Sequence, residues 1–468
     1  MSKLPLVERL LYVEPQLLVD QLPGEEKFLL HSALVGGDIG RFSFLGSDPF
    51  LIFSVKDGKV IVKEKEHRQC YHEEPLIVLK RLLKKYRRSN MSDIPFTGGA
   101  VGFFSYDLGW CFEKLPSSTV DDLRLPDLYL PFYDRVIVVD HIKEETLIFS
   151  HGFPLDGEEG LKRARDRLDE LVGLLNRRTD ANPGKKTEAS AGNMTSNFTK
   201  EDYIKMVKKG KEYIAAGDIF QVNLSQRFQV PISITPWELY QRLADANPAP
   251  FSSFLDFTPV SVVSSSPERY MRLKGNWVET RPIKGTRPRG DNRQEDRRLR
   301  QELYESPKDR AELVMIVDLE RNDLGRVCQV GSVKVPQVFR LEEYATVFHL
   351  VSTVEGMLRP GLDVNDLIKA SFPGGSITGA PKIRAMEIIE ELEPTKRSIY
   401  TGSIGYIDYS GDADLNIVIR TFLIKNNIAY FQVGGAIVAD SDPEAEYQET
   451  LDKAKGLIKS LGKQEGEY

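Results

Sequence analysis

Short β-strands joined by tight turns are the feature of this sequence that most constrains its fold. The segment "RFSFLGSDPFLIFSVKDGKVIVKEKE" is typical of successive strands, and its Asp57-Gly58 pair is a strong signal for a two-residue hairpin turn. Near the C-terminus, "LNIVIRTFLIKNNIAYFQVGGAIVA" is typical of two strands joined at Asn426-Asn427. We find neither a strand–helix–strand rhythm nor a dinucleotide-binding fingerprint in the chain. Antiparallel strands with helices set apart therefore predict an α+β fold.

A change in composition suggests where the chain divides. A charged amphipathic pattern predicts a helix over residues 158–176, and the stretch that follows is polar and poor in apolar residues. Thr199 and Asp202 then resemble a capping box at the start of another helix. We therefore predict an N-terminal domain over residues 1–175, a linker over 176–197 and a second domain over 198–460.

Composition and charge exclude several kinds of partner. The 468 residues carry a net charge of −6, whereas a nucleic-acid-binding surface is usually basic. The three cysteines are odd in number and lack Cys-x-x-Cys spacing, so we expect neither a disulfide framework nor a zinc site. The N-terminal segment has charges within its apolar stretch, and no apolar run is long enough to span a bilayer. We therefore expect a soluble cytoplasmic protein with no nucleic-acid or membrane partner.

A predicted helix near the C-terminus carries a stripe of charged residues. Asp442 and Pro443 suit the start of a helix, which would place Glu446, Glu449 and Lys453 on one face. From the helix pattern alone, a solvated stripe with a Glu449–Lys453 ion pair is the favoured interpretation.

A second carboxylate lies at the edge of a strongly apolar helix. This predicted helix begins at Ser306 and Pro307, and Glu312 precedes its apolar run. Burying a carboxylate is costly unless it pairs with an arginine or binds a cation. This segment alone does not distinguish an ion pair from a cation site. If Glu312 faces Glu449, the two could form an oxygen site for Mg²⁺.

Two further segments could bind or attack a small molecule. Lys284 lies in "ETRPIKGTRPRGDNRQED", where it could be a solvated charge, a phosphate or nucleic-acid contact, or a nucleophile. Acidic residues interrupt this basic run, which disfavours nucleic acid. The glycine-rich loop over residues 374–382 leads into a helix, so its amides could hold an anion, although such loops often only turn the chain.

Taken together, these segments resemble the chorismate-utilising enzymes. The resemblance covers about residues 198–457 and extends more loosely to residues 1–150. It implies large antiparallel sheets packed as a sandwich with helices on the outside. The segments that carry it, in order, are "SSSPERYM", "RPIKGTRPRG", "AELVMIVDLERNDLGRV", "HLVSTVEG", "FPGGSITGAPK", "YTGSIGY", "IRTF" and "DPEAEYQETLDKAKG".

The family pattern also implies a set of site residues. Glu312 and Glu449 would hold Mg²⁺ with the ring carboxylate of chorismate, and Glu446 would support them. His349 would lie beside the ring, and Glu268 would protonate the departing C4 hydroxyl, which requires a raised pKa. The other residues implied to contact the substrate are Thr286, Tyr400, Arg420, Gly434, Gly435, Gly379, Ala380 and Lys453.

Two positions distinguish activities within the family. Isochorismate and salicylate synthases carry a lysine base where this chain has Gln221, so attack by water is disfavoured here. Anthranilate synthases typically have alanine where this chain has Lys284, whereas aminodeoxychorismate synthases typically read "PIKGT", as here. The resemblance therefore implies that Lys284 attacks C2 of chorismate and that ammonia then adds at C4. The alternative is an anthranilate synthase, in which ammonia adds at C2.

The resemblance also implies a partner and an effector pocket. Ammonia would come from a separate glutamine amidotransferase subunit. His31, Ser32, Pro250 and Phe251 match a tryptophan pocket of relatives, but anthranilate synthases generally read "LLES" where this chain reads "LLHS". This departure weakens the expectation that tryptophan inhibits the protein.

Overall fold

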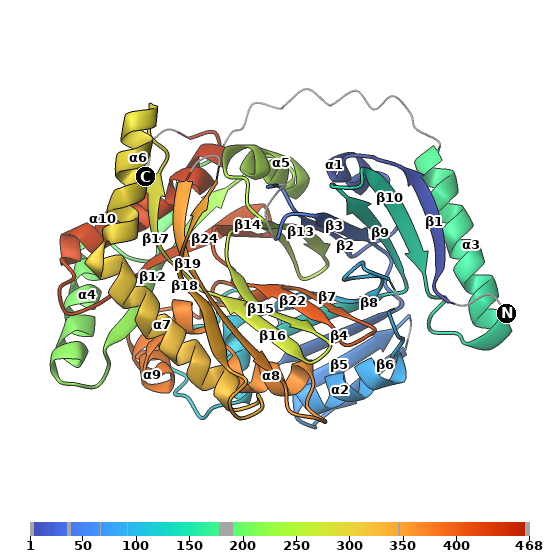
Figure 1. Ribbon diagram of the computed structural model, residues 1–468, viewed down its shortest axis with the longest axis horizontal. Helices are drawn as coiled ribbons and strands as arrows, with labels where there is room; N and C mark the ends of the chain where they lie inside the picture. The colour runs from blue at the N-terminus through green and yellow to red at the C-terminus, as the bar shows by residue number, and fades with distance from the viewer. Residues whose placement is uncertain are drawn as a thin grey trace.

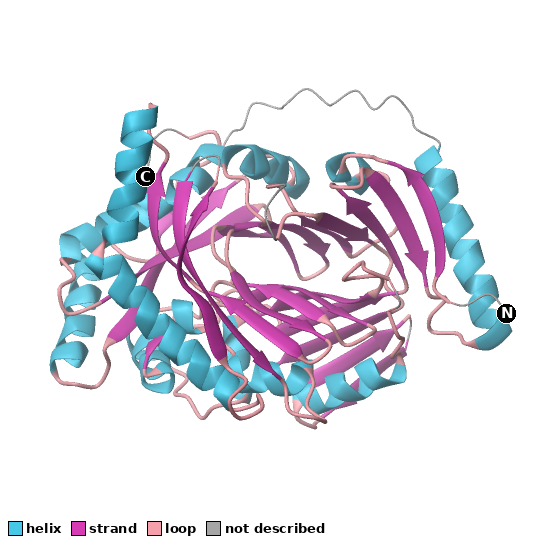
Figure 2. Cartoon of the chain, viewed as in Figure 1, coloured by secondary structure: helices cyan, strands magenta, loops and turns pink. Residues whose placement is uncertain are grey.

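Two large antiparallel β-sheets packed as a sandwich form the body of the protein (Figure 1). The structure is a computed structural model, and it describes residues 4–34, 39–65, 67–90, 92–176, 191–344 and 347–463. Figure 2 shows the strands in two layers, with most helices at the periphery. The predicted α+β fold with outer helices is therefore confirmed.

Within the described residues each sheet has twelve strands. The first sheet, in spatial order, contains β1 (Leu6–Leu11), β10 (Glu145–Ser150), β9 (Arg135–Asp140), β3 (Phe42–Gly46), β2 (Lys27–His31), β13 (Phe251–Phe257), β14 (Val260–Ser266), β23 (Thr421–Lys425), β24 (Ile428–Ile437), β12 (Gln221–Pro231) and β11 (Thr195–Ser196), with β20 (Gly379–Ala380) paired to β12. The second contains β17 (Ile283–Pro288), β19 (Val347–Met357), β16 (Trp277–Arg281), β15 (Arg269–Lys274), β22 (Ala413–Asn416), β21 (Ser403–Asp408), β7 (Gly99–Phe104), β8 (Leu128–Tyr133), β4 (Leu51–Lys56), β5 (Lys59–Glu64) and β6 (His67–Tyr71), with β18 (Lys334–Glu343) paired to β19.

The helices lie mainly on the outer faces of the two sheets. They are α1 (Pro15–Val19), α2 (Pro75–Lys85), α3 (Gly157–Asn176), α4 (Lys200–Ala215), α5 (Pro236–Ala246), α6 (Arg293–Glu305), α7 (Pro307–Gly325), α8 (Val364–Ser371), α9 (Lys382–Leu392) and α10 (Pro443–Ser460), with two 3₁₀ turns, η1 (Tyr106–Cys111) and η2 (Gly375–Ile377). The predicted caps are present, since the Thr199 hydroxyl accepts from the Asp202 N–H and Asp442 accepts from the Ala445 N–H.

An aromatic-rich core joins the inner faces of the two sheets. Phe28 and Val262 of the first sheet belong to the same buried cluster as Phe103 and Tyr133 of the second. The rings of Phe28 and Tyr133 meet edge to face with their centroids 4.6 Å apart. Interdigitation of this kind is what makes two sheets a sandwich.

Local turn chemistry sets the predicted hairpins. Asp57 and Gly58 join β4 to β5 with φ values of 48° and 72°. Asn426 and Asn427 join β23 to β24 with φ values of 52° and 59°. Two consecutive left-handed residues match the twist of the flanking strands, so both predicted turns are confirmed.

Both sheets combine strands from the two sides of the predicted linker. β2 pairs with β13 in the first sheet, and β7 pairs with β21 in the second. The division into residues 1–175 and 198–460 stays a prediction. Residues 177–190 of the predicted linker lie outside the described residues. The end of the predicted linker contains β11, which pairs with β12.

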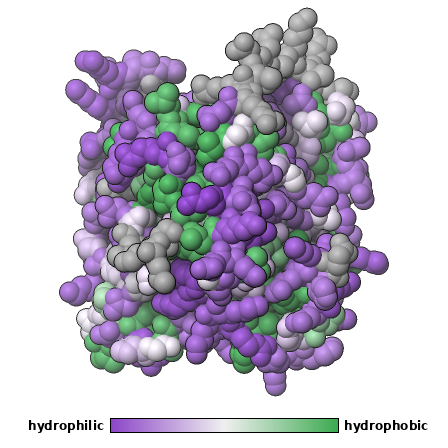
Figure 3. Space-filling model, turned by 90° about the vertical axis from the view of Figure 1, so that its right-hand side faces the viewer, coloured by the Kyte–Doolittle hydropathy of each residue, from purple (hydrophilic) through white to green (hydrophobic). Residues whose placement is uncertain are grey.

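One face of the protein is largely polar (Figure 3). The face in Figure 3 is mostly hydrophilic, with hydrophobic areas interspersed. None of the described helices has both the length and the apolar composition needed to cross a membrane.

Candidate functional site

Glu268 and Arg420 lie where the chain passes between the two sheets. Glu268 lies between β14 of the first sheet and β15 of the second, and Arg420 lies between β22 and β23, which cross in the opposite direction. The crossings are hydrogen-bonded to each other, since the Ile417 N–H donates to the Glu268 carbonyl at 3.0 Å and the Ser265 N–H to the Arg420 carbonyl at 3.1 Å. Residues far apart in the sequence are thereby held side by side.

Lys284 lies on β17, at the edge of the second sheet. The pairing of β17 with β19 shifts register between Lys284 and Thr286, and Gly285 between them has a φ of 77°. A Cβ at Gly285 would lie 2.7 Å from the Leu303 Cδ1, so glycine is required at this bulge. The Lys284 ammonium group donates to the Ser376 carbonyl at 3.4 Å. The side chain therefore points toward η2 rather than into bulk solvent.

The surroundings of Lys284 favour its free amine. Burial lowers the pKa of Lys284, the carboxylates of Glu312 and Glu268 oppose this shift, and the ammonium group of Lys453 adds to it. The net shift is downward from the ordinary value, which is the direction that a nucleophilic lysine requires.

The arginines near Lys284 are not among the main causes of this shift. Each arginine is engaged with carboxylates: Arg281 pairs with Glu342, Arg287 with Glu302 and Asp309, and Arg289 with Asp296.

The surroundings of Glu268 favour the protonated form of its carboxyl group. The side chain is buried, and its Oε1 accepts from the Ile283 N–H at 3.4 Å. Burial raises its pKa, while the Ser376 hydroxyl and the Lys284 ammonium group oppose the shift, and the net result is a pKa above the ordinary value. A raised pKa suits a general acid near neutral pH.

His349 and Thr286 form a hydrogen-bonded pair across β19 and β17. The Thr286 Oγ1 and the His349 Nδ1 lie 2.9 Å apart. Burial and, to a lesser degree, the Arg420 guanidinium lower the pKa of His349 to about 3. His349 is therefore a neutral imidazole at neutral pH and can offer a hydrogen bond beside a substrate but no positive charge.

Two of the predicted metal ligands lie over the backbone of β24. A Cβ at Gly435 would lie 3.0 Å from the Glu446 Oε2 and 3.6 Å from the Glu449 Oε1. Glu446 is buried and accepts from the Ser441 hydroxyl at 2.6 Å, but its Oε2 has no hydrogen-bond partner among the described residues. A buried carboxylate oxygen without a partner is costly unless it binds a cation. The solvated-stripe interpretation of this helix face is therefore wrong for Glu446.

Glu449 and Lys453 link α10 to the same strand. The Lys453 ammonium group pairs with the Glu449 Oε1 at 2.7 Å and donates to the Gly434 carbonyl at 2.9 Å. Burial acts to raise the pKa of Glu449, but Lys453, together with Lys308 and Lys284, outweighs it, so the net shift is downward. Burial raises the pKa of Glu312, and the Glu449 carboxylate adds to this shift. Among the described residues no three His, Cys, Asp or Glu side chains form a complete metal site.

Gln221 begins β12 in contact with the glycine-rich loop. It pairs with Ala380, and a Cβ at Gly379 would lie 2.2 Å from the Gln221 carbonyl oxygen. Gln221 is fully buried, yet neither atom of its amide has a hydrogen-bond partner among the described residues. An unpartnered buried amide often marks a functional position.

Tyr400 and Arg420, two of the residues implied to contact the substrate, lie before different strands, β21 and β23. Tyr400 is buried, and its ring centroid lies 5.9 Å from the Arg397 Cζ. Burial lowers the pKa of Arg420, and the Glu268 carboxylate opposes this shift. A dehydrated guanidinium gains most from a bidentate carboxylate partner.

The residues of the predicted tryptophan pocket line one cavity of about 940 Å³. His31, Ser32, Pro250 and Phe251 all contribute to its wall, whereas Lys284 does not. The His31 Nδ1 lies 2.8 Å from the Tyr240 hydroxyl. Burial lowers the pKa of His31 to about 4, so it is neutral at neutral pH.

Sequence reasoning did not identify two groups near the site. The Ser376 carbonyl accepts a hydrogen bond from Lys284, and its side chain is hydrogen-bonded to Glu268. The sequence indicates only that Ser376 lies in a glycine-rich loop. The ion pair of Arg397 with Glu393 carries no local signal beyond an (i, i+4) spacing.

Comparison with known proteins shows which family the chain belongs to. The model of the chorismate binding enzyme family matches residues 31–459. The chain is 41% identical over 437 residues to the aminodeoxychorismate synthase component 1 of Escherichia coli (93% of each chain). It is 42% identical over 444 residues to the anthranilate synthase component 1 of Aquifex aeolicus (94% of this chain, 90% of the relative). The crystal structure of anthranilate synthase component I from Streptococcus pneumoniae superposes with a TM-score of 0.81 at 33% identity, covering 96% of this chain and 98% of that one. The chain therefore belongs to the chorismate binding enzyme family.

Proposed function

We propose that this chain is the chorismate-converting component of an aminodeoxychorismate synthase. Its substrates are chorismate and ammonia, and its product is 4-amino-4-deoxychorismate, a precursor of 4-aminobenzoate and folate. Relatives named for this activity and for anthranilate synthesis are equally similar in sequence, so single residues must decide between them. The observation that carries the proposal is the Lys284 amine, which has a lowered pKa and points into the site.

The reaction proceeds in two displacements. The free amine of Lys284 adds to C2 of chorismate, both ring double bonds shift by one position, and the C4 hydroxyl leaves as water with the proton of Glu268. Ammonia then adds to C4, both double bonds shift back, and the bond between C2 and Lys284 breaks. The new ammonium group returns a proton to Glu268, so the net change is chorismate plus ammonia to 4-amino-4-deoxychorismate plus water.

Glu312, Glu446 and Glu449 would hold a Mg²⁺ ion, with water and substrate oxygens completing a ligand set that these side chains, as placed, do not form alone. The unpartnered Glu446 Oε2 and the proximity of Glu446 and Glu449 above Gly435 fit such an ion, and Mg²⁺ prefers carboxylate and water oxygens. The ion would neutralise the ring carboxylate of chorismate and orient the ring. Lys453 holds Glu449 and the β24 backbone in register for this role.

The same resemblance suggests where the ammonia comes from and where in the cell the reaction takes place. The relatives are named as component 1, and we propose a glutamine amidotransferase subunit as the second component here. We also propose that the reaction takes place in the cytoplasm.

The product distinguishes the two activities. The protein is incubated with chorismate, Mg²⁺ and an ammonium salt. We expect a product that becomes 4-aminobenzoate only after aminodeoxychorismate lyase is added. Fluorescent anthranilate formed without the lyase as the main product would instead establish an anthranilate synthase.

Removing divalent metal is expected to abolish chorismate consumption, and added Mg²⁺ to restore it. Glu446→Gln is expected to raise the Mg²⁺ concentration for half-maximal rate by about 10–100-fold, because it removes negative charge from the site. Initial rates at a series of Mg²⁺ concentrations measure this. Glu444→Gln is the control, since Glu444 lies in the same helical turn but is exposed and pairs with Lys200. Full activity in excess chelator would refute the metal site.

The cavity at His31 provides a separate prediction about tryptophan. A neutral His31 supplies no anion for the ammonium group of an amino acid. His31→Glu is therefore expected to tighten tryptophan binding by about 10-fold or more, since a charge-assisted hydrogen bond contributes about 1.5–3 kcal/mol. Calorimetric titration measures the affinity, with His67→Glu on the exposed strand β6 as the control. Equal affinities in all three proteins would exclude this cavity as a tryptophan site.

A further inference from the structure

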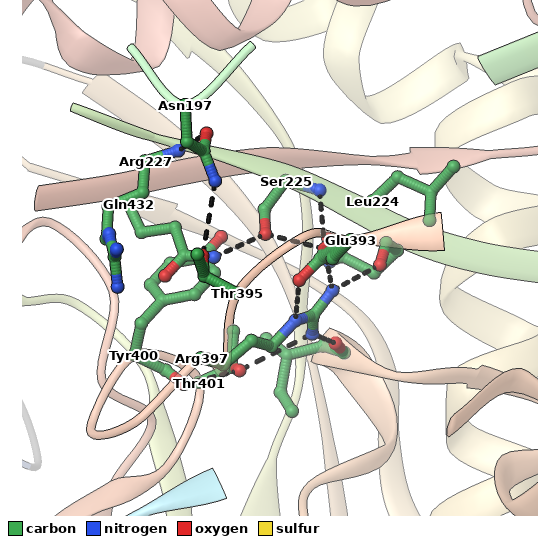
Figure 4. Close-up of polar contacts among 12 residues, drawn as sticks. Asn197, Leu224, Ser225, Arg227, Glu393, Thr395, Arg397, Tyr400, Thr401 and Gln432 are labelled. Atoms are coloured by element: carbon green, nitrogen blue, oxygen red, sulfur yellow. Dashed lines mark hydrogen bonds and ion pairs between the residues drawn. The ribbon is translucent and has the colours of Figure 1, made fainter. Parts of the chain in front are cut away.

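Glu393 and Arg397 form a buried ion pair (Figure 4). Glu393 follows α9 and Arg397 precedes β21, and the Glu393 Oε1 lies 2.7 Å from the Arg397 Nη2. Their side chains are 2% and 1% exposed, respectively. Burying two opposite charges rarely stabilises a fold more than apolar residues of similar volume would. This pair is therefore better explained by the elements that it holds in place than by a contribution to stability.

All five N–H donors of Arg397 are used. The Nε donates to the Glu393 Oε2 at 2.9 Å and the Nη2 to the Glu393 Oε1 at 2.7 Å. The Nη2 also donates to the Asn223 carbonyl at 2.6 Å, and the Nη1 to the Ile377 carbonyl at 3.1 Å and the Thr401 hydroxyl at 3.4 Å. Arginine has five donors in a fixed plane, so one rigid group holds β12, η2 and the turn before β21 together.

Glu393 extends the network to two neighbouring strands. Its Oε1 accepts from the Ser225 N–H at 2.8 Å and from the Ser225 hydroxyl at 2.7 Å. The Gln432 amide donates to the same hydroxyl at 2.8 Å. Ser225 pairs with Gly434 in β24, so the carboxylate sets the position of both strands next to the proposed substrate contacts.

Each element held by this pair carries a residue of the site. Ser376, which meets Lys284 and Glu268, directly precedes Ile377. Gln221 lies two residues before Asn223 on β12. The backbone at Gly434 is opposite Ser225, and Tyr400 lies within the turn that Arg397 caps.

We propose that Arg397, paired with Glu393, is a positioning residue for this reaction, which rests on the function proposed above. It touches none of the proposed reacting groups. It holds η2 so that the Ser376 carbonyl and hydroxyl contact Lys284 and Glu268. Directly and through Glu393, it also holds β12 and β24, which carry Gln221 and Gly434. A displacement of about 1 Å at reacting groups can cost about 100-fold in rate, so a loosened network affects catalysis more than folding.

Arg397→Lys tests this, because lysine keeps the charge but loses the planar fork. The matched control is Arg135→Lys. Arg135 is also buried, pairs with Glu170 and donates to the Arg167 carbonyl, but it lies on β9 near the far edge of the first sheet. We measure the thermal midpoint, kcat and KM for chorismate, and the anthranilate share of the product, all with Mg²⁺ and an ammonium salt.

We expect both variants to lower the thermal midpoint similarly. Only Arg397→Lys is expected to lower kcat by about 10-fold or more, with a smaller change in KM, and to raise the anthranilate share as Lys284 loses its alignment. If Arg397→Lys does not fold, Ser225→Ala replaces it and should lower kcat about threefold by removing one hydroxyl from the network.

Different results would contradict the proposed function and the positioning role of Arg397. A wild-type protein that does not consume chorismate overturns both the proposed function and this inference. An active wild type, together with an Arg397→Lys variant whose kcat and product ratio match those of Arg135→Lys, overturns the positioning role alone. Wild-type kcat in Ser225→Ala does the same where Arg397→Lys is unfolded.

Discussion

Lys284→Ala is expected to lower the rate of 4-amino-4-deoxychorismate formation by about 1,000-fold or more, because it removes the proposed nucleophile. With C2 no longer blocked by the adduct, ammonia can attack there, so we expect a small amount of anthranilate instead. Lys284→Arg should be as inactive as Lys284→Ala, because a guanidinium keeps the positive charge but is not a nucleophile at neutral pH. Chromatographic separation of the products after lyase treatment measures both activities.

The comparison between these two variants separates a nucleophile from a charge. If Lys284 acted only by its charge, Lys284→Arg would retain most of the wild-type rate, and that result would remove the adduct mechanism. Lys334→Ala is the control, since Lys334 is exposed at the start of β18 in the same sheet. It should leave both the rate and the product unchanged.

Glu268→Gln is expected to lower kcat by about 100–10,000-fold, since a glutamine cannot donate the proton that the departing C4 hydroxyl requires. The wild-type rate should also depend on pH in a bell-shaped manner. Burial lowers the pKa of Lys284, so the free amine becomes available as the pH rises through that lowered value. Burial raises the pKa of Glu268, so the proton is retained until the pH rises through that raised value. Both shifts increase the fraction of enzyme that has an uncharged amine and an uncharged carboxyl group.

The pH dependence of Glu268→Gln provides the second measurement. Its remaining activity should no longer fall on the alkaline side, because the group that loses its proton there is absent. The two apparent pKa values belong to the coupled pair and not to either residue. Glu343→Gln, at an exposed position of β18 that pairs with Arg300, should keep the wild-type profile. A Glu268→Gln enzyme within about tenfold of the wild-type kcat would show that another group supplies the proton.

In the segment around β12, burial does not follow the alternation of apolar and polar residues. In "DIFQVNLSQRFQV", strict alternation would put Phe220 on one face with Val222 and Leu224, but Phe220 precedes β12 and is 73% exposed, whereas the other two are buried. Gln221 on the opposite face is buried as well. Alternation along a strand defines two faces but cannot say whether a second layer covers the polar one.

Local sequence determined the turns at Asp57-Gly58 and Asn426-Asn427 and the caps at Thr199 and Asp442, because these depend on groups only a few residues apart. Family motifs identified the candidate site residues. Only the tertiary structure decided that Lys284 meets Ser376 and that Glu446 is buried with an unpartnered oxygen. The physical reason is that both depend on the pairing of distant strands and on burial by distant elements, which no local pattern encodes.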